Sequence, residues 1–169
     1  MARFVYGFEL YRPQQQAHDY FYPGYGANSE VFAKGDPVAA GATGLVVAGT
    51  TATVIGIAVR DQTMSSTNQT AAKVRPALIP TNPEYEFLAS GNADMNSLTQ
   101  IGITYQLVGT TGAIMVDVTT GTRAAVTNAA VIICTDIDPD REGGAGDEGG
   151  ARLGVFRFVK GVNAPNSRT

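Results

Sequence analysis

The sequence predicts an all-β protein. Short runs of β-branched and other apolar residues alternate along the chain with clusters of Gly, Asn, Asp and Thr, and stretches with helical periodicity are few. The length of 169 residues corresponds to about one ordinary domain. We therefore expect a compact β-barrel, β-tulip or sandwich with an extended N-terminal arm and at most one short helix.

Eleven segments are expected to form strands, because each is short, apolar or alternating, and bounded by turn-forming residues. They are residues 4–11, 30–33, 37–39, 44–48, 53–60, 77–79, 84–89, 104–108, 114–119, 129–136 and 152–160. A single helical turn is expected within 92–101, with Asp94 or Asn96 as its cap. Some of these strands are expected to merge or to be absent.

Two of the segments alternate clearly enough to predict which side is buried. In 84–89 the residues Tyr85, Phe87 and Ala89 are expected to face the core. Leu88, with the two glutamates of that segment, is expected on the solvent side. In 152–160 the alternation shifts near Phe156, which predicts a β-bulge there.

The chain divides into three parts. Residues 1–29 form the expected arm, because Pro13, Pro23, Gly24 and Gly26 interrupt any regular element there. Residues 30–162 form the β body, with polar loops expected at 62–72 and 136–150. The polar residues 163–169 are expected to be a frayed tail.

Composition narrows the range of partners. The net charge is −3 with a pI near 5.0, and the twelve Lys and Arg residues are scattered, so nucleic acid is not an expected partner. No apolar stretch approaches the length that spans a bilayer, so no membrane is expected either. Cys134 lies in an apolar run and is expected to be buried. We expect the chain to be made and used in a cytoplasm, or in a particle assembled there.

Candidate catalytic residues are few. His18 is the single histidine and lies in a Gln-rich part of the arm, where a solvent or interface role is the simpler interpretation. Glu84 and Glu86 lie at i and i+2 of a predicted strand, a spacing that resembles the carboxylate pair of an inverting glycosidase. A charged solvent side of a half-buried strand explains that pair more simply. We therefore expect no catalytic residues, and a small hydrolase remains the lesser hypothesis.

Two motifs, one acidic and one rich in glycine, resemble ligand sites in part. Asp136, Asp138 and Asp140 have the spacing of calcium ligands, but Arg141 stands where an EF-hand loop needs glycine. The glycine-rich residues 143–150 contain two acids and no lysine, so they would repel phosphate. The expectation is a solvated loop with no metal and no cofactor.

Aromatic residues concentrate at the N-terminus. Of the seven Phe and seven Tyr, nine lie in the first 32 positions. Aromatic side chains bury large areas, and tyrosine keeps a polar tip, so both are favoured at protein interfaces. We predict that the arm binds a partner through eight of them: Phe4, Tyr6, Phe8, Tyr11, Tyr20, Phe21, Tyr22 and Tyr25. The alternative is that this segment folds back and caps its own core.

The order of several passages resembles the capsid decoration, or cement, proteins of tailed bacteriophages. These passages are VFAKGDPV at 31–38, TVIGIA at 53–58, LTQIGITYQLV at 98–108, MVDV at 115–118 and GVFRF at 154–158. The resemblance covers roughly residues 30–160 and is one of pattern and order. No catalytic residues carry over, because the family has no active site.

The resemblance implies a function. It implies a small β domain with terminal arms that binds the outer surface of an assembled head, often as a homotrimer, and stabilises contacts between major capsid subunits. The expected location is then the outer capsid surface of a virion. The alternative is another virion component, in the tail, neck or head fibre, whose β domain binds a glycan or the host.

Overall fold

The computed structural model describes residues 7–12, 20–49, 52–93, 95, 97–122, 131–137 and 153–159. These residues form twelve strands and two short helical turns, which confirms the all-β prediction. The strands are β1 (Glu9–Arg12), β2 (Val31–Phe32), β3 (Pro37–Gly41), β4 (Gly44–Val47), β5 (Val54–Ala58), β6 (Gln62–Thr63), β7 (Leu78–Pro80), β8 (Glu86–Ser90), β9 (Thr104–Val108), β10 (Met115–Thr122), β11 (Ile132–Ile137) and β12 (Leu153–Phe158). The turns are η1 (Asn68–Ala72), of π type, and η2 (Leu98–Gln100), of 3₁₀ type.

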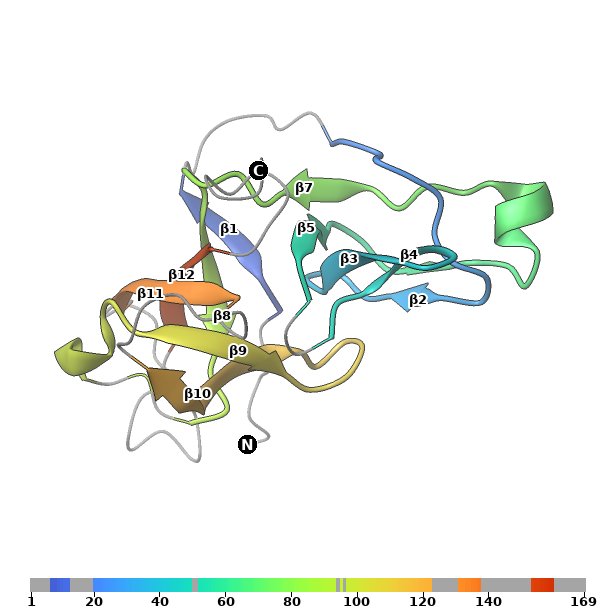
Figure 1. The fold of residues 1–169 in the computed structure, drawn as a ribbon. Coiled ribbons are helices and arrows are strands. Elements are labelled where there is room, and N and C mark those ends of the chain that lie inside the picture. The colour runs from blue at the N-terminus through green and yellow to red at the C-terminus, as the bar shows by residue number, and fades with distance from the viewer. Residues whose placement is uncertain are drawn as a thin grey trace.

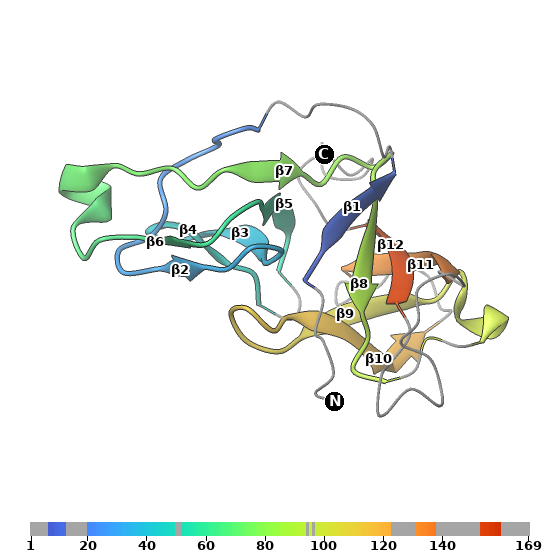
Figure 2. The same cartoon turned by 180° about the vertical axis from the view of Figure 1, so that it is seen from behind.

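The strands form a large sheet, a small sheet and a two-stranded ribbon, all antiparallel. The large sheet has the order β1-β8-β12-β11-β9-β10, the small sheet β4-β3-β5-β7, and the ribbon pairs β2 with β6. The large sheet occupies one half of the molecule, and the small sheet and the ribbon occupy the other (Figures 1 and 2). The sheets do not close into a barrel in the described residues, so the barrel form of the prediction is not observed.

The N-terminal strand belongs to the large sheet. β1 pairs with β8, where Glu9 lies opposite Leu88 and Arg12 opposite Glu86. The chain then crosses to the other half, builds both of its sheets over residues 20–80, and returns to the large sheet at β8. Among the described strands, β1 thus lies at the edge of the sheet with β8 as its neighbour.

One hydrophobic cluster joins the two halves. Its aromatic centre in the large half comprises Phe8, Phe87 and Phe158, with ring centroids 5.3 Å apart for Phe8–Phe158 and 5.5 Å for Phe87–Phe158. Val54 and Ile57 of the small sheet belong to the same cluster. Burying one such aromatic side chain stabilises a fold by about 1.5–3 kcal/mol, so the halves share a substantial core.

A turn in each half completes the junction. The buried Asp36 carboxylate accepts hydrogen bonds from Ala33 N (3.0 Å) and from Gly112 N in the β9–β10 turn (3.0 and 3.1 Å). Burial nevertheless raises the pKa of Asp36, because desolvation outweighs these bonds. Nearby, Gly35 has φ +88° and lies so close to Gly7 that a Cβ on either residue would clash with the other's backbone.

Several local predictions can be compared with the structure. Cys134 is buried and unpaired, as predicted, and burial raises its pKa to about 12. The predicted bulge occurs on the partner strand, where the β11 register shifts between Cys134 and Asp136, opposite Phe156 and Val155. The prediction for Leu88 is wrong: it is 1% exposed, because it packs with two residues of β12 in a separate cluster.

Turn chemistry also differed from expectation. The N-cap of η2 is Ser97, not Asp94 or Asn96, because Ser97 and Gln100 form a reciprocal capping box. η1 and the strand β6 both lie in the stretch 62–72 that was predicted to be a polar loop. Short elements of this kind carry little hydrophobic pattern, so sequence periodicity does not detect them.

Candidate functional site

The structure separates the eight predicted partner-binding residues. Phe4 and Tyr6 lie outside the described residues. Phe8 is 3% exposed and belongs to the core, so it is not available to a partner in this structure. Tyr11 and Phe21 are half-buried and pack against the protein's own hydrophobic clusters. Tyr20 and Tyr22 are 52% and 45% exposed, and Tyr25 is half-buried.

The described part of the expected arm lies on the body. Beyond the β1–β8 pairing, Phe21 exchanges backbone hydrogen bonds with Leu78 (3.2 and 3.3 Å), and Gly26 makes a bridge to Leu45. This arrangement follows the alternative in which the aromatic segment caps its own core. Among the described residues of this segment, Tyr20 and Tyr22 are the aromatic side chains that remain largely accessible.

An exposed surface in the small half gathers two of these tyrosines with cationic residues. We call Tyr22, Tyr25, Lys73, Val74 and Arg75 the tyrosine–arginine patch. The Arg75 guanidinium carbon lies 4.6 Å from the Tyr25 ring centroid, and Lys73 Nζ lies 5.6 Å from the same centroid. Arg75 Nη1 also donates a hydrogen bond to the Tyr22 carbonyl oxygen at 3.1 Å. Hydrogen bonding and positive charge from Arg75 lower the pKa of Tyr25.

The patch is held in shape by Asn68, a buried side chain at the start of η1. Its amide nitrogen donates to Gly26 O (2.7 Å) and Val74 O (3.0 Å), and its amide oxygen accepts from Val74 N (2.9 Å). Gln69 adds a bond from Nε2 to Gly26 O at 2.6 Å. The Asn68 side chain therefore links the backbone at Gly26, which lies 42 residues away in the sequence, to the backbone at Val74.

Only some residues of the patch could be predicted from the sequence. The tyrosines were identified from the aromatic concentration, but Lys73, Val74 and Arg75 were not. Asn68 lies in the stretch 62–72 that was predicted to be a polar loop, and no local pattern distinguishes it there. Nothing in the local sequence shows that its amide closes onto Gly26, because that contact spans two loops.

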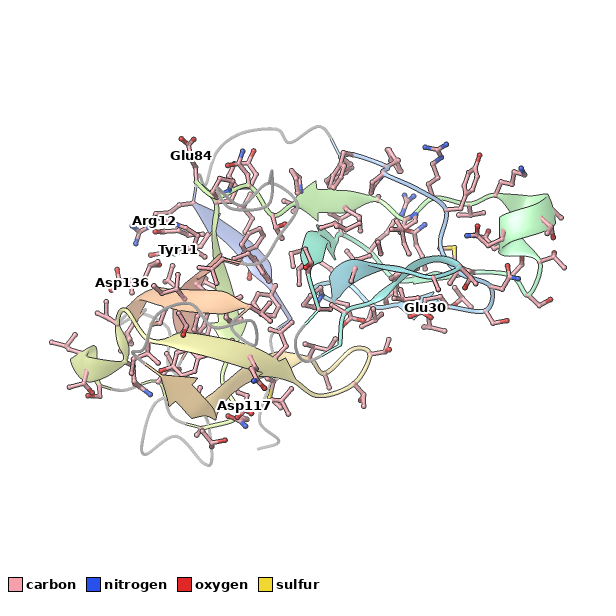
Figure 3. The ribbon with its side chains drawn as sticks, in the orientation of Figure 1. Tyr11, Arg12, Glu30, Glu84, Asp117 and Asp136 are labelled. Carbon is pink, nitrogen blue, oxygen red and sulfur yellow. The ribbon has the colours of Figure 1, made fainter. Side chains whose placement is uncertain are left out.

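The paired glutamates of the hydrolase hypothesis lie in a different environment. Glu86 lies between Arg12 (Nε to Oε2, 3.2 Å) and Arg157 (Nη2 to Oε1, 3.3 Å). The Arg12 contact is off the hydrogen-bond direction, so the buried Oε2 has a charge partner without a hydrogen bond. Glu84 is exposed and precedes β8 (Figure 3). Two guanidinium groups thus contact the Glu86 carboxylate, whereas Glu84 lies ahead of the strand at the surface.

The acidic loop is only partly described. Asp136 forms an ion pair with Arg12 (Oδ2 to Nη2, 3.3 Å), and the two side chains lie on the same side of the large half (Figure 3). Asp138, Asp140 and the glycine-rich residues 143–150 lie outside the described residues, as does His18. In the described residues no group of three or more His, Cys, Asp or Glu could hold a metal ion.

Comparison with known proteins adds no family. No protein-family model, no curated protein and no solved structure matches the chain. None of the helices in the described part is long and apolar enough to cross a membrane. The fold and the surface thus define an all-β protein of antiparallel sheets with a preformed tyrosine–arginine patch.

Proposed function

We propose that this chain is a capsid decoration (cement) protein that binds the outer surface of an assembled phage head and stabilises contacts between major capsid subunits. The tyrosine–arginine patch is the observation that carries this proposal. Tyrosine and arginine are the residue types enriched among interface residues that dominate binding energy. Here they lie together on an exposed surface instead of in the core.

The side chains of the tyrosine–arginine patch are restrained by contacts within the protein, which favours binding. Arg75 is stacked on Tyr25 and bonded to the Tyr22 backbone, so two flexible side chains are already restrained before any partner arrives. A restrained surface loses less conformational entropy on association. Lys73 and Arg75 also give this surface a local positive charge on a chain of net charge −3, so its partner surface should be acidic.

Cementing requires binding and no chemistry. A protein that binds the assembled shell, and not its separated subunits, stabilises the shell by mass action. The proposed partner is the major capsid protein, and the proposed assembly is a homotrimer on the virion surface. In a closed trimer three modest sites act together, so avidity multiplies the effect of each.

Thermal disruption of phage heads prepared with and without the protein tests the proposal. Added protein should raise the temperature at which the heads release DNA. Arg75→Ala and Tyr22→Ala should each weaken attachment about tenfold or more, the loss expected for an important interface residue. Arg60→Ala, which removes another exposed cation outside the patch, is the matched control and should bind as the unaltered protein does.

Equal survival of heads with and without the protein would contradict the cement role. Attachment to isolated tails or necks, with none to heads, would instead favour the other virion component. Sedimentation of the purified protein tests the trimer directly, and a monomer at all concentrations would contradict that part.

A further inference from the structure

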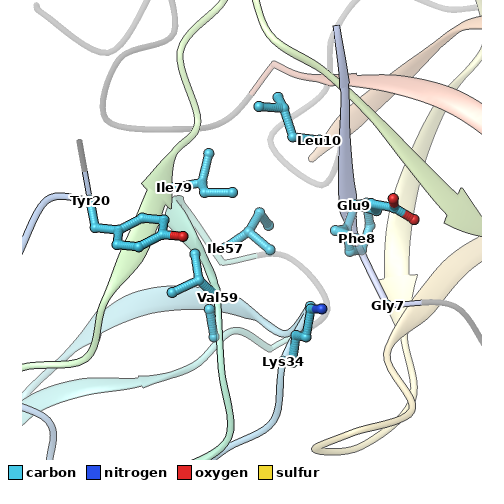
Figure 4. A pocket seen from close by; sticks show the side chains of 11 residues that line it. Gly7, Phe8, Glu9, Leu10, Tyr20, Lys34, Ile57, Val59 and Ile79 are labelled. Atoms are coloured by element: carbon cyan, nitrogen blue, oxygen red, sulfur yellow. The ribbon is translucent and has the colours of Figure 1, made fainter. Parts of the chain in front are cut away.

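A groove of about 460 Å³ lies between the edge strand β1 and the small sheet. Its volume is in the range of ligand-binding clefts. Leu10, Ile57 and Ile79 point into it from the two sides, and the Tyr20 ring and the Lys34 side chain lie at its margins (Figure 4). The groove is therefore apolar at its floor and polar at its ends.

One wall of the groove is strand backbone. Four consecutive residues, 7–10, line it, and side chains of a strand alternate between faces, so backbone atoms must contribute. Phe8 N donates to Gly35 O (2.9 Å), which lies on the side of the strand away from β8. Because backbone groups alternate in direction along a strand, the N–H and C=O of Leu10 face that same side. β1 thus offers a pairing edge to the groove.

The positive charge of Lys34 at the margin of the groove favours a ligand that carries a negative charge. Two charged residues, Glu9 and Lys34, line the groove, and Glu9 has an interaction of its own. The Lys34 side chain is exposed, and no ion pair between described residues engages its ammonium group. Asp61 accepts a hydrogen bond from the Lys34 backbone (2.8 Å), which fixes the position of the residue. A carboxylate at this end of the groove would complement the lysine.

We propose that this groove binds an extended peptide segment of a partner protein, which adds to β1 as a further strand. Its backbone pairs with Leu10, its alternate apolar side chains pack on Val59 and Ile79, and an acidic residue reaches Lys34. A lipid chain would satisfy the floor but would leave the strand edge unpaired. The groove shares no residue with the tyrosine–arginine patch, so this inference does not depend on the cement role.

Selection from an mRNA-displayed library of random seven-residue peptides on the immobilised full-length chain tests the groove. Recovered peptides should alternate β-branched apolar residues with polar ones and contain an acidic residue. A synthetic copy of the best peptide should shift the Leu10 amide and the methyl signals of Val59 and Ile79 in NMR spectra. Lys34→Glu should weaken its binding at least tenfold, and Lys73→Glu, the same charge change in the patch, should not.

N-methylation of the peptide tests strand addition without altering the protein. Methylation of the amides that face β1 should abolish binding, and methylation of the alternate amides should leave it nearly unchanged. Equal losses of binding on methylation of either set of peptide amides would overturn strand addition. Recovery of no peptide above the bare support, or equal binding to Lys34→Glu, would overturn the proposal, as would saturable binding of dodecanoate without peptide enrichment.

The two sites can fail separately. Loss of peptide binding in Lys34→Glu with normal attachment to heads would leave the cement role intact. Loss of attachment in Arg75→Ala with normal peptide binding would leave the groove intact.

Discussion

The phenylalanines at the centre of the large half and the tyrosines of the tyrosine–arginine patch in the small half serve opposite purposes. In the large half Phe8, Phe87 and Phe158 pack edge to face or tilted in a closed core. In the small half Tyr22 and Tyr25 lie at the surface, where Arg75 stacks on the Tyr25 ring and donates a hydrogen bond to the Tyr22 carbonyl oxygen. A phenyl ring has no polar group to solvate, whereas a tyrosine hydroxyl must keep water or a partner, so residue type alone begins to separate the roles.

The strongest test of this comparison is Phe8→Ala. Removing a fully packed aromatic ring should lower the free energy of unfolding by about 3–5 kcal/mol, measured by urea denaturation. Tyr20→Ala, which truncates a ring that is 52% exposed, is the control and should change stability far less. An unaltered stability for Phe8→Ala would mean that this residue belongs to a free arm.

Asn68→Ala tests whether the patch depends on its buried amide. The substitution leaves Val74 N without its acceptor, while Gly26 O and Val74 O each lose one of two donors and keep Gln69 Nε2 and Gly26 N. Unfolding should therefore become easier by about 1–3 kcal/mol. Attachment to the partner should weaken as well, because Tyr25 and Val74 lose their fixed positions. Asn28→Ala removes one exposed acceptor, for Gln69 N, and should cost less than Asn68→Ala in the same urea titration. Equal effects would contradict the special role of Asn68.

Asp36, at the junction of the halves, gives a pH dependence with a defined sign. Its raised pKa means that the folded chain holds this proton more tightly than the unfolded chain does. Its contribution to stability is therefore largest below the unfolded pKa of about 3.9 and declines as the pH rises through the folded pKa. The unfolding free energy of the unaltered protein minus that of Asp36→Asn should fall with rising pH across this range. A rising difference would show that the amides of Ala33 and Gly112 outweigh desolvation.

The smallest stability effect is expected at Tyr22. Tyr22→Ala should change the free energy of unfolding by no more than about 0.5 kcal/mol, because Tyr22 lies at the surface and belongs to no hydrophobic cluster of the described residues. The same variant should lose attachment to heads. A thermal melt and a binding measurement on one preparation would sharpen the contrast with Phe8, where stability is expected to change. A large loss of stability would place Tyr22 among the structural aromatics.

Much of the fold was predictable because strand patterns are local. The apolar run around Cys134 predicted its burial. The bulge predicted near Phe156 was wrong for that strand: β12 pairs with β8 without a shift, and the irregularity lies on β11. The candidate site was predictable only through its tyrosines. Arg75 and Asn68 gave no signal, since their importance comes from contacts with residues far away along the chain.

The sequence by itself determined an all-β chain, its main strands and the concentration of aromatics near the N-terminus. Only the tertiary structure decided that Phe8 is core and Tyr22 is surface, because burial depends on which layer covers each face of a sheet. Leu88 shows the same limit: its strand alternates, yet packing of β12 residues on the second face buries it too. The groove beside β1 likewise exists only where two distant segments meet, which periodicity along one strand cannot encode.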